Sequence, residues 1–147
     1  MSPAKKRSLD SLGSPEDWIV HAKSDLALAT VAQANRTVDI LDEQICFHAQ
    51  QAAEKALKAV LLFNHVDFKL GHDLSYLLDL IETTGTSIPA EIEDVESLTP
   101  YAVTFRYPGY TDDETGNVDV SETIAIASRT ITWAESIVME PAHGTIL

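Results

Sequence analysis

The sequence predicts an all-α fold, an up-and-down bundle of about five helices, and three observations support this fold class. Apolar residues repeat at helical spacing along most of the chain, without an alternating strand pattern, an internal repeat or a Gly-rich phosphate loop. Prolines and turn-forming residues separate these periodic stretches. The stretch 45–69 is rich in alanine and free of Gly and Pro, which suits a central helix with close neighbours on more than one side. We expect the bundle over residues 14–140, between a disordered tail at 1–13 and a C-terminal tail at 141–147.

The composition is that of a single globular domain. The chain has 147 residues, of which 45% are hydrophobic and 22% charged. No apolar run is long enough to span a membrane and the N-terminus lacks the apolar segment of a signal peptide, so we expect a cytoplasmic protein. The single cysteine, Cys46, excludes an intramolecular disulfide and a cysteine-based zinc site. It is expected to be buried as a small apolar residue.

The first helix is expected to begin after Ser14, a good capping residue, with Pro15 in its first turn. Its buried stripe repeats at helical spacing and comprises Trp18, Ile19, Ala22, Leu26, Ala29 and Val31. The residues 35–37 interrupt this pattern. A second helix is then expected from Val38 or Asp39 to about His65, some seven turns, antiparallel to the first.

The central part of this second helix carries an apolar face and two polar rows. The apolar face comprises Ile45, Leu57, Val60, Leu61 and Phe63, joined by alanines at 49, 52, 53, 56 and 59. One polar row holds Gln51, Lys55 and Lys58, and the other holds Gln50 and Glu54. The simplest interpretation is a solvated face, on which Glu54 and Lys58 form a favourable i,i+4 surface pair. A cleft or a subunit contact is the alternative.

The remaining helices have recognisable ends. Asp73 can cap a third helix that ends at 83–85, and 89–91 opens a fourth. Pro100 breaks the fourth helix, so a further short segment with Tyr101 is expected after it. Residues 107–117 form an acidic, turn-rich loop. The last helix begins at Asp119, whose spacing to Glu122 fits a capping box, and runs to Met139.

Net charge restricts the binding partners. The chain has a net charge of −13, and from Ser8 onward seven Lys and Arg face all 23 Asp and Glu, which leaves −16. Such a surface repels a phosphate backbone unless its few cations are gathered in one place. We therefore do not expect strong nucleic-acid binding by the chain alone. A basic protein partner, or a cleft that gathers Lys55, Lys58 and Arg106, is compatible with this charge.

Three sequence blocks together resemble the HEPN domain family. They are FHAQQAAEKALKA at 47–59, GHDL at 71–74 and FRYP at 105–108, in the family's order. The likeness covers the chain from about Trp18 to Glu140. It implies a helical bundle that usually forms a homodimer. It also implies a prokaryotic protein encoded beside a minimal nucleotidyltransferase, as a toxin–antitoxin or nucleotide-binding pair.

The chain departs from the family's ribonuclease motif, in which an Arg is followed after four to six residues by a His. An Arg can hold the scissile phosphate and a His can exchange the proton of the attacking hydroxyl, so both must lie close together. After Arg106 no histidine occurs before His143. A ribonuclease would need a relocated histidine such as His48 or His72. The sequence therefore leaves open whether this chain is an enzyme, and we propose no catalytic residues.

Arg106 has two interpretations. It can pair with a carboxylate such as Glu54 and fix the adjacent loop. Alternatively it joins a polar pocket for a phosphate, nucleotide or partner, with an aromatic ring stacking on a base. The candidate binding residues for the second interpretation are Gln51, Lys55, Lys58, His72, Tyr101, Arg106 and Tyr107.

The other titratable residues suggest no cofactor and no metal site, because no ligand-like cluster of His and carboxylates occurs at helical spacing apart from Asp17 and His21. His21 and His65 are expected on the surface. His72, which precedes Asp73, is more typical of a helix-cap region than of an acid–base catalyst. Three functional classes remain: a module that binds a nucleotidyltransferase or nucleotide, a ribonuclease toxin with a degenerate motif, and a small-ligand-binding dimer.

Overall fold

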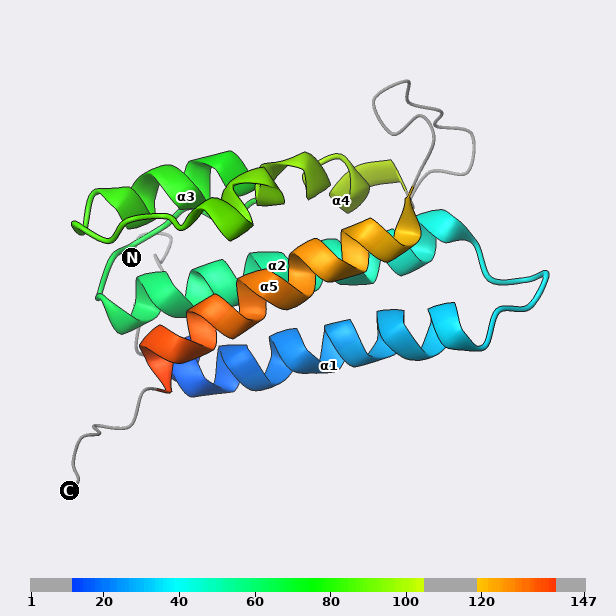
Figure 1. Cartoon of the computed structure of the whole chain (residues 1–147). Coiled ribbons are helices and arrows are strands. Elements are labelled where there is room, and N and C mark those ends of the chain that lie inside the picture. Colours follow the sequence, from blue (N-terminus) through cyan, green and yellow to red (C-terminus); the bar gives the residue numbers. More distant parts are fainter. Residues whose placement is uncertain (1–11, 105–118, 140–147) are drawn as a thin grey trace, which may run out of the picture.

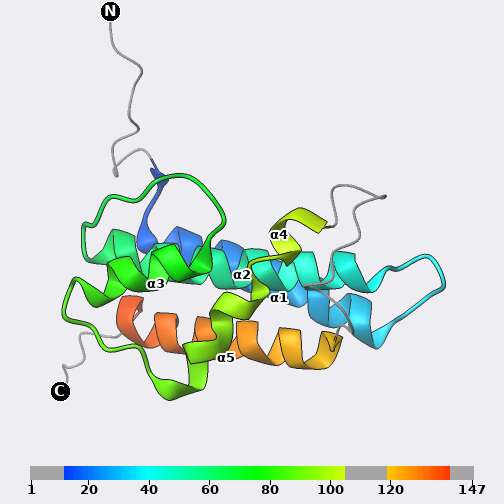
Figure 2. The same cartoon turned by 90° about the horizontal axis from the view of Figure 1, so that it is seen from above.

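The computed structural model describes residues 12–104 and 119–139, and in these residues it contains helices and no strands. Three long helices, α1 (Pro15–Ala34), α2 (Asp42–Phe63) and α5 (Val120–Val138), pack along one another. The α3 helix (Leu74–Glu82), the 3₁₀ helix η2 (Ala90–Leu98) and the short α4 helix (Tyr101–Thr104) pack on α2 and α5, on the side away from α1 (Figures 1 and 2). The predicted all-α fold class is confirmed.

The α1 helix begins as its sequence predicts. The Ser14 hydroxyl accepts a hydrogen bond from the Asp17 amide at 3.0 Å, and the Asp17 carboxylate accepts one from the Ser14 amide at 3.2 Å. This capping box satisfies two of the amide groups that every helix start leaves without a partner. One predicted member of the buried stripe is wrong, because Val31 lies on the outer face of α1 and is exposed.

The α2 helix is the centre of the bundle, since it contacts α1, α3, η2, α4 and α5. Its five alanines at 49, 52, 53, 56 and 59 are fully buried, which confirms the predicted small-residue contact face. Phe63, expected on the same face, is exposed at the end of the helix.

The start of α2 differs from the prediction. The helix begins at Asp42, not at Val38 or Asp39, and it ends at Phe63. Arg36 explains the later start, because its guanidinium donates to the Ile40 carbonyl at 3.1 Å and to Asp42 Oδ1 at 2.7 Å. These bonds fix residues 36–41 as a turn between two antiparallel helices (Figure 1).

The helix caps in the second half of the chain agree with the sequence predictions, but the fourth predicted helix is not an α-helix. The Asp73 carboxylate accepts from the Ser75 and Tyr76 amides, and that of Asp119 accepts from the Glu122 amide. The fourth predicted helix, at 90–98, is a 3₁₀ helix. Its buried residues are spaced by three, the period at which side chains align in a 3₁₀ helix: Ile92, Val95 and Leu98.

Cys46 lies fully buried in α2, as predicted. Burial raises the pKa of its thiol to about 11, so the sulfur stays protonated at neutral pH. None of the helices in the described part of the chain is both long and apolar enough to cross a membrane. The predicted terminal tails fall on residues outside or at the edge of the described ranges.

Candidate functional site

The polar rows of α2 are not a solvated face. Glu54 is 4% exposed and Lys58 5%, and Gln50 is fully buried. The interpretation as a surface pair is therefore wrong. The reason is that α1 covers this side of α2, and the loop before α3 approaches it through Gly71 and His72.

Glu54 is the centre of the first polar cluster. Its carboxylate lies 2.8 Å from Lys58 Nζ and 2.9 Å from His72 Nδ1, and it accepts a hydrogen bond from Gln50 Nε2 at 2.9 Å. Burial opposes ionisation of Glu54, but the hydrogen bond and charge of Lys58 and the bonds from Gln50 and His72 outweigh it. The pKa of Glu54 therefore lies below its ordinary value, and the carboxylate is charged at neutral pH.

The Lys58 ammonium is enclosed on several sides. Besides Glu54, it reaches the Gly71 carbonyl at 3.3 Å. The ring centroids of Trp18 and Phe68 lie 5.9 and 5.5 Å from Nζ. Aromatic faces attract a cation, so these rings and the carboxylate together compensate for the water that a buried lysine loses. Lys58 thus has a structural role, and its charge is not available to bind a ligand.

A second cluster joins α1 to α2 around Asp25. Lys55 Nζ lies 2.7 Å from Asp25 Oδ2, and His48 Nδ1 lies 3.1 Å from Asp25 Oδ1. The sequence analysis did not single out Asp25. A signal was present, because this acid lies three residues after Ala22 and four before Ala29, on the buried side of α1.

Gln51 extends the first cluster toward the surface. Its Nε2 donates to Gln50 Oε1 at 2.8 Å, and Gln50 in turn donates to Glu54. Gln51 and Lys55 are half-buried, so part of each side chain meets solvent. The structure thus brings together four of the predicted binding residues along one side of α2: Gln51, Lys55, Lys58 and His72.

Each cluster holds one histidine in a defined orientation. The His48 and His72 side chains are 38% and 39% exposed, and each places Nδ1 against a carboxylate. With the Nδ1 proton donated to that carboxylate, Nε2 is left as a hydrogen-bond acceptor. Such an arrangement suits the binding of a donor or the acceptance of a proton.

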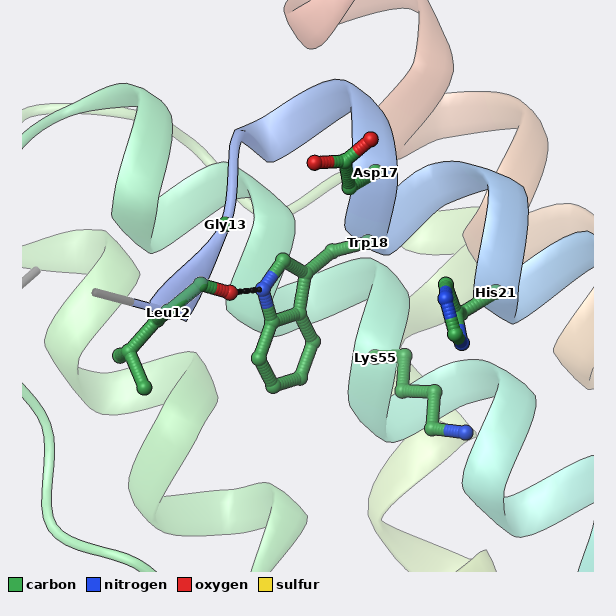
Figure 3. Close-up of a pocket in the computed structure, with 6 residues that line it drawn as sticks. All are labelled: Leu12, Gly13, Asp17, Trp18, His21 and Lys55. Atoms are coloured by element: carbon green, nitrogen blue, oxygen red, sulfur yellow. Dashed lines mark hydrogen bonds between the residues drawn. The ribbon is translucent and has the colours of Figure 1, made fainter. Parts of the chain in front are cut away.

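A pocket of about 300 Å³ lies beside the Asp25 cluster (Figure 3). The Trp18 ring lies between Leu12 on one side and His21 and Lys55 on the other. Trp18 Nε1 donates to the Leu12 carbonyl at 2.6 Å, which fixes the indole ring. The pocket therefore combines an aromatic surface with two side chains that can donate hydrogen bonds. Of its lining residues, the sequence analysis assigned a binding role only to Lys55.

The other predicted site residues do not join these clusters. Tyr101 is 8% exposed in the core, where burial raises the pKa of its hydroxyl, and this disagrees with an exposed stacking ring. Arg106 and Tyr107 lie outside the described residues. The carboxylate suggested as the partner of Arg106, Glu54, is bound by Lys58 and His72. His21 and His65 are exposed, as expected.

The fold and the site define a helical bundle whose central helix carries buried charged clusters. The model of the HEPN domain matches residues 15–137, and the chain belongs to this family. A solved structure, ST0689, described as an archaeal HEPN homologue, is 29% identical to the chain. The alignment covers 86% of this chain and 98% of ST0689, with a TM-score of 0.59. A comparison with curated proteins gave no match.

These comparisons confirm the predicted family over nearly the same range of residues as the motifs suggested. Two of the three motif blocks lie within the described residues, and both are parts of the Glu54 cluster. The first supplies Glu54 and Lys58, and the second supplies Gly71 and His72. In this chain the family resemblance therefore coincides with a buried polar contact between α2 and the loop before α3.

Proposed function

We propose that this HEPN domain is an interaction module that binds a basic protein partner, of the minimal nucleotidyltransferase kind that the family resemblance implies. The observation that carries the proposal is that most of its described Lys and Arg side chains are already paired with acidic side chains of the same chain. The described residues hold six Lys and Arg, and five of them form ion pairs with Asp or Glu. The sixth is Lys69, whose Nζ lies 5.1 Å from the Tyr76 ring centroid.

When the described part of the domain pairs its cations with its own acids in this way, it has few free positive charges with which to bind a phosphate backbone. Nucleic-acid binding draws most of its strength from unpaired Lys and Arg that displace counterions. A basic protein, in contrast, is attracted by the net charge of −13. The partly exposed side of the Asp25 cluster supplies specific contacts, because Lys55 and His48 retain donor and acceptor capacity toward a second molecule.

The proposal is tested by co-expression with the product of a neighbouring gene of the minimal nucleotidyltransferase type. Light scattering after size-exclusion chromatography should show a stable complex of fixed stoichiometry. Its affinity should fall as salt is raised, because long-range charge attraction is screened. Lys55→Ala should weaken it, while Lys69→Ala, a change at a lysine that forms no ion pair with the described residues, should not. Two separate peaks at low salt would contradict the proposal.

The pocket beside Trp18 supports a second candidate function, the binding of a small planar ligand such as a nucleotide base. Bases stack on aromatic rings, and Lys55 and His21 can donate hydrogen bonds to ring nitrogens or carbonyls. The chain has two tryptophans, so Trp133→Phe leaves Trp18 as the single indole fluorophore. Titration of that variant with adenosine and with ATP should quench its emission, and Lys55→Met should weaken the effect. Unchanged fluorescence with both ligands would dismiss this candidate.

The ribonuclease alternative rests on Arg106, which lies outside the described residues, and on a relocated histidine. A cleavage assay on single-stranded RNA distinguishes it from the module. Cleavage that is lost in Arg106→Ala and in either His48→Ala or His72→Ala would favour the ribonuclease.

A further inference from the structure

The turn between α1 and α2 presents two apolar side chains to solvent. Val38 is 95% exposed and Leu41 is 53% exposed. Neither belongs to the core, whereas Ile40 of the same turn is half-buried and packs against it. We call Val38 and Leu41 the apolar tip. The turn that carries them projects past the N-terminal end of α5 at one end of the bundle (Figures 1 and 2).

Local structure does not explain these two residues. The Ile40 amide donates to the Thr37 carbonyl at 3.1 Å, so Val38 occupies a central position of a turn, where Pro, Asn, Asp or Gly is usual. Leu41 is the N-cap of α2 and makes no capping bond with its side chain. Ser, Thr, Asp or Asn is preferred at an N-cap, and α1, α3 and α5 each begin with one of these. The turn thus departs from local preference twice, each time toward an exposed apolar side chain, and such departures are expected at functional sites.

The turn is held in one conformation by side-chain hydrogen bonds. The Arg36 guanidinium bridges its two ends, with bonds to Gln33 Oε1 at 3.0 Å and to Asp42 Oδ1 at 2.7 Å. Within the turn, the Asp39 amide donates to Thr37 Oγ1 at 3.3 Å. Because the turn is already ordered, binding through it costs little conformational entropy.

The apolar tip continues the exposed side of the Asp25 cluster. Leu41, His48 and Lys55 follow one another at intervals of seven residues, which is close to two helical turns. They therefore lie in one row along α2, and at 1.5 Å per residue this row extends about 21 Å. A partner that contacts Lys55 and His48 is thus led along α2 to the turn.

We infer that the apolar tip inserts into an apolar recess of the basic partner, and that Lys or Arg side chains surround this recess. Charge complementarity supports this occupant. Asp39 and Glu43, on either side of Leu41, are exposed and form no ion pair with the described residues, whereas Arg36 is paired with Asp42. A matching surface is therefore apolar at its centre and basic around it. A nucleic acid would bring phosphates toward these free carboxylates and be repelled.

The apolar tip is an anchor and not a complete interface. A stable interface buries on the order of 800 Å² on each partner, far more than one valine and one leucine present. The row along α2 supplies further contact area. The inference rests on the proposed function and adds to it the surface by which the partner is recognised.

The first test uses the chain alone. Val38→Asn with Leu41→Ser gives the turn and the N-cap the residue types that local structure favours. Because neither change removes a core contact, the midpoint of urea denaturation should stay the same or rise. A lower midpoint would show that these side chains stabilise the fold, and would overturn the inference.

The second test measures the complex with the co-expressed minimal nucleotidyltransferase. The same double variant should raise the Kd of this complex at least about tenfold. Leu70→Ser is the matched control, because Leu70 is 87% exposed in the loop that follows the other end of α2. This change should leave the Kd as it is in the wild type.

The carboxylates beside the apolar tip are tested separately. Asp39→Asn with Glu43→Gln should raise the Kd several-fold and make it less dependent on salt, because the charges that attract the basic surface are removed. Glu82→Gln, at an exposed acid of α3, should do neither.

The outcomes separate this inference from the proposed function. If the wild-type chain forms no complex, both are wrong. If Lys55→Ala weakens the complex while the variants of the apolar tip bind like the wild type, only this inference is overturned. If the apolar tip variants weaken it and Lys55→Ala does not, the turn is the recognition surface and the Asp25 cluster is not.

Discussion

The two polar clusters of this HEPN domain use the same residue types in different surroundings. Asp25 is paired with Lys55 and His48, and Glu54 with Lys58 and His72. Water reaches the first cluster, where the Lys55 side chain is 27% exposed, but hardly reaches Lys58, at 7%. Glu54 also accepts a bond from a buried glutamine, and Lys58 is enclosed by two aromatic rings.

This difference separates a structural contact from a site that can exchange partners. Removing one member of a buried ion pair strongly destabilises the fold, because the remaining charge stays out of water without a partner. A partly exposed pair can replace a lost partner by water or by a ligand. The Glu54 cluster therefore has the features of a structural contact, whereas the Asp25 cluster fits the proposed binding role, and the following substitutions test this distinction.

Lys58→Met should have the largest effect. It keeps the length of the side chain but leaves the Glu54 carboxylate buried without its main positive partner. The free energy of unfolding should fall by about 3–5 kcal/mol, measured by urea denaturation at pH 7. The double variant Glu54→Gln/Lys58→Met should recover part of this loss. A decrease below about 1 kcal/mol would show that Glu54 is better hydrated than the structure indicates.

Lys55→Met should cost less stability. The Asp25 side chain is 12% exposed and keeps His48 as a partner, so we expect a decrease of about 1–3 kcal/mol in the same measurement. Binding, in contrast, should respond more strongly to this change than to Lys69→Ala. If Lys55→Met destabilised the fold as much as Lys58→Met, the two clusters would not differ as proposed.

The contribution of Glu54 to the stability of the fold should depend on pH. A carboxyl group whose pKa is lowered by folding stabilises the fold above its ordinary value, here 4.5, and loses this contribution as the pH falls through the lowered pKa. Glu54→Gln removes the titrating group, so its destabilisation at pH 7 should shrink below about pH 4.5. Urea denaturation of both proteins between pH 7 and pH 3 measures the difference, and parallel curves would contradict the lowered pKa.

Phe68→Leu should have the smallest effect. Leucine keeps apolar volume beside Lys58 but removes one of the two rings that face its ammonium group. The loss should be about 0.5–1 kcal/mol, the range for a cation–π contact. In the Lys58→Met background, the additional cost of Phe68→Leu should be smaller, since no cation remains. An equal cost in both backgrounds would assign Phe68 to packing alone.

The sequence predicted the features that depend on neighbouring residues. The Ser14, Asp73 and Asp119 caps are local signals, and so is the alanine face of α2. The sequence also predicts a helix at η2, and the three-residue spacing of its buried residues matches the observed 3₁₀ geometry.

The candidate site depends on contacts between distant residues and was predicted only in part. An i,i+4 pair such as Glu54 and Lys58 has the same spacing on a surface and in a core. What buries it is α1 on one side and the segment around Gly71 on the other, and neither can be inferred from α2 alone. Asp25 was missed because its role appears only when Lys55, thirty residues later, lies beside it.

Cys46 supplies a direct means to follow how often the bundle opens. It is the single cysteine of the chain, it lies buried near the start of α2, and its thiol stays protonated at neutral pH. A thiol reagent can modify it only in molecules whose core has transiently separated. Under conditions where closing is fast, the labelling rate reports the population of open molecules. The open population of the same protein can thus be measured with and without a bound partner. No cysteine needs to be introduced by mutation.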